Sequence, residues 1–141
     1  MGHEEMICAL ERIIRSRKAA QRSVLSQSSL HVGQPAMLRF ICDHPGCSQK
    51  QIADEVEVTP ASVAASIKRM ERAGLITRRE DTADTRCNRV YMTPAGEREL
   101  DFSSEALERV NVSMMNGISE EEQKLLVKLL EKMILNLRNN I

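Results

Sequence analysis

The chain has 141 residues, in which 20 Lys and Arg balance 20 Asp and Glu, and aromatic residues make up only 2%. This length suffices for one domain with appended helices and for a core that needs neither disulfides nor metal. No stretch reaches the roughly 18 apolar residues of a membrane-spanning helix, and the N-terminus lacks a signal-peptide pattern. We therefore expect a cytoplasmic protein with reduced cysteines and no membrane partner.

The first third of the chain predicts two helices separated by a turn. Residues 4–22 carry apolar side chains at helical spacing, and basic side chains gather toward the C-terminal half, where cations suit the helix dipole. Residues 23–33 are rich in turn-forming residues and end this helix. A second helix is expected from Gln34 to about His44, with Pro35 in its first turn, where a missing N–H costs nothing.

A short third helix is expected over residues 48–56. Ser48 has the residue type of an N-cap, and Gln51 three positions later completes a capping box. The segment Glu57-Val58-Thr59 then gives a tight turn before the next helix. The order of helix, tight turn and helix predicts a helix-turn-helix, a unit that lies on duplex DNA.

The helix expected over residues 59–73 has two chemically different faces. Its inner face is a stripe of Val63, Ile67 and Met70, which a helical wheel places within about 40° of one another. The opposite face is small, polar and rich in donors, as a helix that approaches base edges and phosphates requires. The DNA-binding residues expected on this helix are Thr59, Ala61, Ser62, Ala65, Ser66, Lys68 and Arg69. The alternative is a solvated helix face in a helical bundle.

A basic β-hairpin is expected directly after this helix. Residues 75–79 and 88–93 alternate at period two, and residues 82–87 form the tip. We expect Arg78 to contact DNA and Arg86 to enter a narrow minor groove, with the carboxylate of Asp84 orienting the Arg86 guanidinium. The alternative for the Asp84–Arg86 pair is a surface ion pair of little energetic value.

Charge is distributed unevenly along the neutral chain. Residues 58–93 carry seven Lys and Arg against four Asp and Glu, whereas residues 94–141 carry six against nine. Patch charge governs phosphate affinity, and an excess this modest favours a dimer as the binding unit. Helical periodicity resumes at Pro94 and continues to about Met115. A capping box at Ser119 then opens a last helix that ends near Arg138.

The central part of the chain, residues 34–96, resembles the MarR family of winged-helix regulators. The resemblance rests on Gln34 opening the second helix and on the stretch SQKQIADEVEVTPASVAASIKRMERAGLITRRED. It also rests on the Asp84-Thr85-Arg86 wing tip and on the Met92-Thr93-Pro94-Ala95-Gly96 exit. The tip and exit together are more specific than a helix-turn-helix alone. The flanking helices match in position and length.

The resemblance implies a mainly α fold with a small β-wing. Residues 34–93 would form a winged helix-turn-helix DNA-binding domain, residues 1–33 an N-terminal dimerisation helix and loop, and residues 94–141 the C-terminal dimerisation helices. It implies a homodimeric, sequence-specific transcriptional regulator on double-stranded DNA, with half-sites of a pseudo-palindromic operator about 34 Å apart. The family pattern further implies a repressor that is released by a small-molecule effector bound between the dimerisation helices and the winged lobe.

Two alternatives to this function stay open. Within the same fold, Cys8 or Cys87 could sense oxidants. The acidic neighbours of Cys8 disfavour a reactive thiolate, so we expect Cys8 to be a buried structural cysteine instead of a sensor. The position of Cys87 beside Arg86 favours DNA contact over redox chemistry. In a different class, the winged fold could bind protein instead of DNA.

Metal binding and catalysis have little support in the sequence. Cys42, His44 and Cys47 lie close together, but their spacing across a Pro-Gly turn is not a usual zinc pattern. The chain has neither a Gly-rich phosphate loop nor a recognisable nucleophile setting. We therefore expect no cofactor, no metal and no enzymatic activity.

Overall fold

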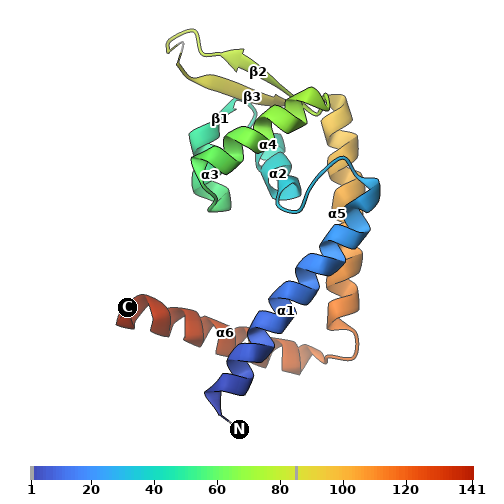
Figure 1. The fold of residues 1–141 in the computed structure, drawn as a ribbon, viewed down its shortest axis with the longest axis vertical. Coiled ribbons are helices and arrows are strands. Elements are labelled where there is room, and N and C mark those ends of the chain that lie inside the picture. Colours follow the sequence, from blue (N-terminus) through green and yellow to red (C-terminus); the bar gives the residue numbers. More distant parts are fainter. Residues whose placement is uncertain (1, 85) are drawn as a thin grey trace. The chain divides into compact units, whose positions relative to one another are not determined.

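The computed structural model describes residues 2–84 and 86–141 of the chain. Its elements, drawn in Figure 1, are α1 (His3–Val24), the 3-10 helix η1 (Leu25–Gln27), α2 (Gln34–Asp43), β1 (Cys47–Ser48), α3 (Gln49–Val56), α4 (Pro60–Arg72), β2 (Ile76–Glu80), β3 (Asn88–Met92), α5 (Pro94–Met115) and α6 (Glu120–Asn140). The chain divides into two compact units, Met1–Val110 and Asn111–Ile141.

The helices and the hairpin predicted from periodicity are confirmed, with ends that differ from the prediction by one or two residues. Two short elements have no counterpart in the prediction. One is η1, which lies in the turn-rich segment after α1, and the other is β1, which lies directly before α3. Both are too short to give a periodic pattern, so their existence depends on what they pack against.

The predicted helix caps are present and make the expected hydrogen bonds. Ser48 Oγ accepts from the backbone N–H of Gln51 at 3.1 Å, and Gln51 Oε1 accepts from the backbone N–H of Ser48 at 2.9 Å. Thr59 Oγ1 accepts from the N–H of Ser62 at 3.2 Å, and the box predicted at the start of α6 is also formed. Each cap satisfies a backbone donor that the helix itself leaves unpaired.

The three strands form one antiparallel sheet in the order β1–β3–β2. The two wing strands, β2 and β3, pair along their full length. On the other side of β3, Cys47 of β1 lies opposite Val90 and Ser48 lies opposite Arg89. Because β1 leads straight into α3, this pairing attaches the start of α3 to the returning strand of the wing.

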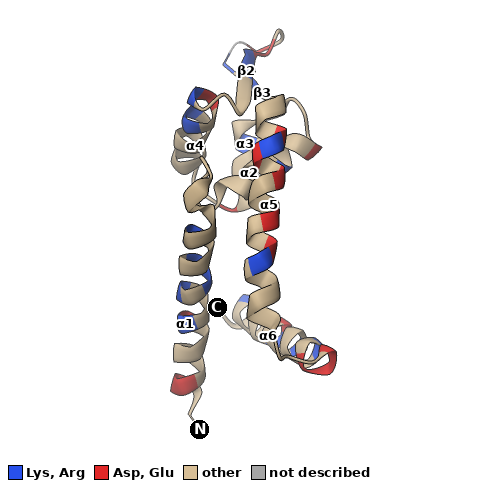
Figure 2. Cartoon of the chain, turned by 90° about the vertical axis from the view of Figure 1, so that its right-hand side faces the viewer, with Lys and Arg blue, Asp and Glu red and all other residues tan. Residues whose placement is uncertain are grey.

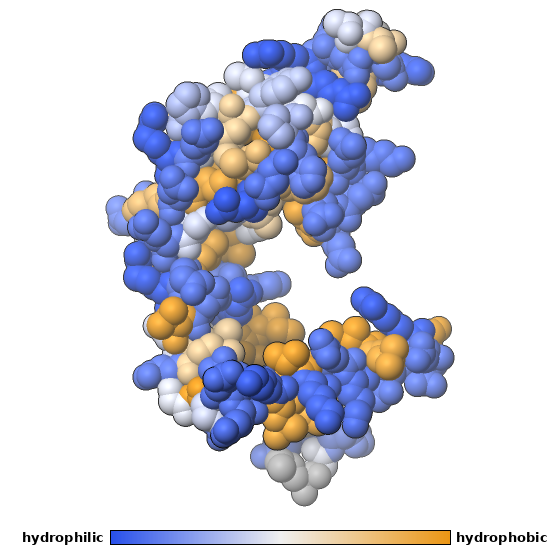
Figure 3. All heavy atoms as spheres, turned by 180° about the vertical axis from the view of Figure 1, so that it is seen from behind, coloured by the Kyte–Doolittle hydropathy of each residue, from blue (hydrophilic) through white to orange (hydrophobic). Residues whose placement is uncertain are grey.

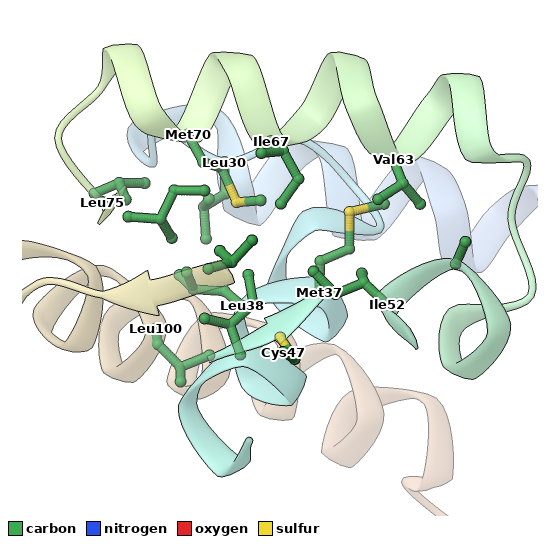
Figure 4. Close-up of a cluster of buried hydrophobic side chains, with 14 residues drawn as sticks. Leu30, Met37, Leu38, Cys47, Ile52, Val63, Ile67, Met70, Leu75 and Leu100 are labelled. Atoms are coloured by element: carbon green, nitrogen blue, oxygen red, sulfur yellow. The ribbon is translucent and has the colours of Figure 1, made fainter. Parts of the chain in front are cut away.

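The core is an apolar cluster to which α2, α3, α4, the sheet and α5 all contribute (Figure 4). Val63, Ile67 and Met70 are almost fully buried, which confirms the inner stripe predicted for α4. Burying one such side chain stabilises the fold by about 1.5–3 kcal/mol. The cluster consists of Leu30, Met37, Leu38, Ile41, Cys47, Ile52, Ala53, Val63, Ile67, Met70, Leu75, Ile76, Val90 and Leu100.

The turn that ends α4 packs closely against the start of α5. Gly74 has a φ of 76°, the left-handed conformation predicted for the residue after this helix. Thr93 Oγ1 donates to the carbonyl of Gly74 at 2.6 Å, and the N–H of Thr93 donates to the carbonyl of Leu75 at 3.0 Å. A Cβ at Gly96 would lie 2.2 Å from the Leu75 oxygen, so only glycine permits this approach.

Neither α1 nor α6 has a buried residue among those described. Several large apolar side chains of α1 are instead exposed, as at Ile7 and Ile14. Figure 3 shows hydrophobic residues on the surface of α6, where the exposed apolar side chains are Leu125, Leu126, Val127, Leu129, Ile134, Leu135 and Leu137. Apolar helix faces of this extent usually mark a contact with another molecule.

None of the helices in the described part of the chain is long and apolar enough to cross a membrane.

Candidate nucleic-acid interface

The outer face of α4 is exposed and polar, opposite the face that packs on the core. Of the residues predicted to bind DNA on this helix, Ser66 is half-buried, and the exposed ones are Thr59, Ala61, Ser62, Ala65, Lys68 and Arg69. The basic residues lie toward the C-terminal half of the helix, and those of α4 and β2 are coloured in Figure 2. The fold therefore presents the predicted set on the solvent side of the domain.

The N-terminal turn of α4 combines small side chains with donors that are held in place. The Thr59 hydroxyl donates to Ser62 Oγ at 3.0 Å while it accepts from the backbone N–H of the same residue. Ala61 and Ala65 add no bulk on this side, so the backbone can approach a flat partner closely. The first turn of α4 has no acidic residue, so the positive end of its dipole is not opposed.

The wing tip carries Arg86, whose side chain is 91% exposed. Asp84 Oδ1 lies 3.2 Å from Arg86 Nε and also accepts from the backbone N–H of Arg86 at 3.1 Å. One carboxylate oxygen thus holds both the main chain and the guanidinium of Arg86, as the spacing of these residues predicts. The intervening Thr85 lies outside the described residues.

Arg78 points back toward α4, whereas the sequence predicts that it contacts DNA. Its Nε and Nη2 donate to the two carboxylate oxygens of Glu71 at 3.0 Å and 2.9 Å. This bidentate pair joins β2 to the last turn of α4, and the hydrogen bonds from Arg78 lower the pKa of Glu71. Arg78 therefore has a structural partner that the sequence does not predict.

A second arginine, Arg89, closes the base of the wing tip. Its Nε donates to Asp81 Oδ2 at 2.8 Å, and its Nη1 donates to the carbonyl of Gly46 at 3.2 Å. Asp81 Oδ1 also accepts from the N–H of Ala83 at 2.7 Å. The Ala83 N–H and the Arg89 guanidinium together lower the pKa of Asp81. We call the Asp81–Arg89 pair the wing brace.

The remaining wing arginine, Arg79, is exposed on β2. Its guanidinium carbon lies 4.8 Å from the centre of the Tyr91 ring on β3. A cation over an aromatic face keeps the outer edge of the guanidinium open to solvent. Arg79 and Arg86 are thus the exposed residues among the wing arginines, whereas Arg78 and Arg89 are half-buried.

A cavity of about 310 Å³ lies where α1 passes into the connection toward α2. Apolar side chains from Leu25, Leu30 and Val32 line it together with polar groups from Arg22, Ser26, Ser28, Ser29 and His31. Ser28 Oγ and the N–H of Ser29 both donate to Glu99 Oε1 on α5. The wall of this cavity is therefore hydrogen-bonded directly to α5.

The cysteines have different environments, and one prediction about them is wrong. Cys8 is exposed on α1, although we expect it from the sequence to be buried, and none of the described residues of α1 is buried. Cys87 at the wing tip is half-buried. Cys47 is buried in the core, and this burial raises the pKa of its thiol. Among residues 2–84 and 86–141, no group of three or more His, Cys, Asp or Glu is placed to hold a metal ion.

The chain is similar to known transcriptional regulators over most of its length. Residues 19–86 match the sequence profile of the MarR family. The transcriptional regulator HosA of Escherichia coli O157:H7 is 36% identical over 101 residues, which are 72% of this chain and 75% of that protein.

Solved structures of regulators match the fold as well. The transcriptional regulator SlyA is 27% identical, with a TM-score of 0.79 over 96% of this chain and 95% of that one. BpsR of Bordetella bronchiseptica is 26% identical, with a TM-score of 0.78 over 89% of each chain. With its exposed α4 face, its β-wing and this relationship to HosA, the chain belongs to the MarR family of winged helix-turn-helix transcriptional regulators.

Proposed function

We propose that the protein binds a specific DNA operator as a homodimer and represses transcription until a small-molecule effector releases it. The observation that carries this proposal is the pairing of an exposed, donor-rich α4 face with a wing-tip arginine that Asp84 holds in position. Both features belong to one compact unit, so a single lobe can contact two grooves of the same duplex.

In this mechanism α4 enters the major groove and reads base edges. Ala61 and Ala65 allow close approach, the Ser62 hydroxyl bonds to bases or phosphates, and Lys68 and Arg69 bind the backbone or guanine edges. Arg86 enters the adjacent minor groove and responds to its width and negative potential. The excess of basic residues in 58–93 supports this assignment, since phosphate contacts supply much of the affinity.

Homodimerisation is supported by the uncovered apolar faces of α1 and of α6. A second copy of the chain would cover both faces and remove this apolar surface from water. Two lobes would then reach successive major grooves on one side of the duplex. A pseudo-palindromic operator follows, because its symmetry matches the two-fold axis of the dimer.

The proposed effector site is the cavity lined by the end of α1 and the connection toward α2. Its cationic Arg22, its His31 and its serine hydroxyls, set among apolar side chains, suit a small organic acid. The regulator BpsR is described as controlled in its DNA binding by 6-hydroxynicotinic acid, a ligand of this chemical class. Release requires the effector to bind the DNA-incompetent state more tightly, and the link from Ser28 to Glu99 offers a route to α5.

The test is to enrich duplexes from a random-sequence library with the wild-type protein and to measure their affinity by fluorescence anisotropy. We expect a common, roughly palindromic motif, and we expect Arg86→Ala to weaken binding while the oligomeric mass stays unchanged. Arg98→Ala is the matched control, because Arg98 is also exposed but belongs to α5 and not to α4 or the wing. Absence of any enriched motif at low salt, with the protein folded, would refute the proposal.

A further inference from the structure

A second cavity, of about 300 Å³, lies between the start of α3 and the wing tip. Ser48, Gln49 and Lys50 line it from the side of α3, and Asp84, Arg86 and Asn88 line it from the side of the wing. These two segments are more than thirty residues apart in the sequence, and neither is part of the α4 face. Arg86 belongs both to this cavity and to the proposed minor-groove contact.

The two walls of the cavity are fixed to each other. Ser48 pairs with Arg89 across the β1–β3 ladder, directly beside the cavity. The Arg89 guanidinium then reaches back to the carbonyl of Gly46, while Asp81 holds it from the other strand. The sheet and the wing brace therefore fix the base of the wing tip relative to the start of α3.

The cavity is lined by two cationic side chains and by several hydrogen-bond donors. Lys50 and Arg86 supply positive charge, and the side chains of Gln49, Lys50 and Asn88 form no hydrogen bond or ion pair with another described residue. The acidic side chain that lines it, Asp84, already accepts twice from Arg86 through Oδ1. The chemistry of these walls suits an anion that can accept several charge-assisted hydrogen bonds.

We propose that this cavity binds a phosphodiester group of the DNA backbone beside the minor groove that receives Arg86, with Lys50 as its phosphate-binding residue. This inference rests on the proposed function. The minor groove is only about 6 Å wide, so an arginine that enters it has backbone phosphates on either side. Lys50 borders the same cavity as Arg86, which brings its ammonium group to one of these phosphates. Such a contact reads no sequence, but it fixes the register in which α4 meets the bases.

The salt dependence of binding tests the role of Lys50. With duplexes enriched by the wild-type protein, Lys50→Ala should make the plot of log affinity against log salt concentration shallower by about 0.9 for each protomer that loses the contact. The affinity should fall by the same factor for an enriched and for a scrambled duplex. Lys50→Arg should keep the wild-type slope, and Lys18→Ala, which removes an exposed lysine of α1, should leave slope and affinity unchanged. An unchanged slope for Lys50→Ala would overturn the inference.

Neutral phosphate analogues locate the contact. Enriched duplexes are made with a single methylphosphonate at each backbone position in turn. At one position per half-site, we expect the substitution to weaken binding by the wild type but to cause no further loss for Lys50→Ala. Absence of any such position would overturn the inference. A second result would also overturn it. If inorganic phosphate raised the melting temperature of the wild type but not that of Lys50→Ala, and the two proteins had equal salt slopes for DNA binding, the cavity would hold a free anion instead of the DNA backbone.

The outcome separates this inference from the proposed function. If Arg86→Ala loses affinity while Lys50→Ala keeps the wild-type salt slope, the protein binds DNA and only the phosphate cavity is refuted. If the wild-type protein binds no duplex, the proposed function itself fails. Circular dichroism melts establish that each variant is folded, which is expected because the Lys50 side chain is exposed.

Discussion

The arginines of the wing have similar positions in the sequence but different partners in the fold. The side chain of Arg86 is 91% exposed and, among the described residues, is held by Asp84, whereas that of Arg78 is 26% exposed and bound through two nitrogens to Glu71. A guanidinium that already has a bidentate partner has fewer donors to offer to DNA. At the scale of single residues, the wing therefore separates arginines that stabilise the fold from those left free to bind.

Removal of the Glu71 carboxylate should affect stability more than DNA binding. Glu71→Gln breaks the bidentate pair, and because the pair is partly solvated we expect a loss of up to about 1 kcal/mol in the free energy of unfolding. DNA affinity should not fall, since the change removes a negative charge near the interface. Urea denaturation and anisotropy titrations measure the two effects, and a weaker affinity with unchanged stability would contradict this assignment.

The wing brace predicts a pH dependence of stability. The Ala83 N–H and Arg89 lower the pKa of Asp81, so the folded state favours the charged carboxylate. The ionised Asp81 carboxylate therefore adds to the free energy of unfolding above the ordinary aspartate pKa of about 4. This contribution is lost as the pH falls through the lowered pKa of the folded state. Asp81→Asn should therefore melt below the wild type at pH 7, and the difference should shrink below pH 4. The control is Asp101→Asn, at an exposed position of α5, which should show no such trend.

At the scale of elements, the junction between α4 and α5 depends on a close backbone contact that leaves no room for a side chain. Gly96 lies against the carbonyl of Leu75, and Thr93 bonds to Gly74 in the same turn. These contacts set where α5 leaves the lobe that carries α4. An added methyl group at this position must displace backbone rather than a flexible side chain.

Gly96→Ala should be strongly destabilising for that reason. A Cβ 2.2 Å from the Leu75 oxygen forces a backbone shift, for which overpacking of a core suggests a loss of about 1–3 kcal/mol. Chemical denaturation measures the loss. Gly2→Ala is the matched control, because its Cβ would come no closer than 4.0 Å to another atom, and equal stabilities of the two variants would show that the junction is not tightly packed.

The elements and interface residues that the sequence predicts depend on residues that lie within one or two helical turns of one another. The capping boxes, the α4 stripe and the Asp84–Arg86 pair all involve residues at most a few positions apart. The wing brace and the cavity beside Lys50 escape prediction because the register of the sheet brings their parts together. The burial of Cys8 is wrongly predicted for a related reason, since the neighbours of a residue in the sequence do not show whether another element covers it.

At the scale of the whole molecule, the proposed dimer requires α1 and α6 to be covered by a second chain. The apolar side chains of α6 are distributed along its whole length, whereas its charges begin with three consecutive glutamates. A duplex with two half-sites binds both lobes of such a dimer at once. Affinity then depends on the link between lobes as much as on either reading surface.

Charge placed on the α6 face should separate the proposed dimer. We expect the double substitution Leu126→Glu and Leu129→Glu to give a particle of 15.9 kDa, half the mass of the wild-type dimer, in light scattering. Its affinity for a palindromic duplex should fall by at least tenfold, because the second lobe is no longer tethered. Lys132→Glu is the control, because it adds a negative charge to α6 at a position that is already polar, and it should keep the dimer mass. A wild-type protein of monomer mass would refute the dimer.

The wing brace also separates the tip of the hairpin from the rest of the wing. The ion pair between Asp81 and Arg89, together with the hydrogen bond from the Asp81 N–H to the Cys87 carbonyl, closes the loop before its outermost residues begin. None of the described residues between Asp81 and Arg89 belongs to the core cluster, so substitutions there should mainly change what the tip contacts. In the proposed complex with DNA, exchanging this short loop should therefore change the operator preference while the rest of the scaffold keeps its sequence.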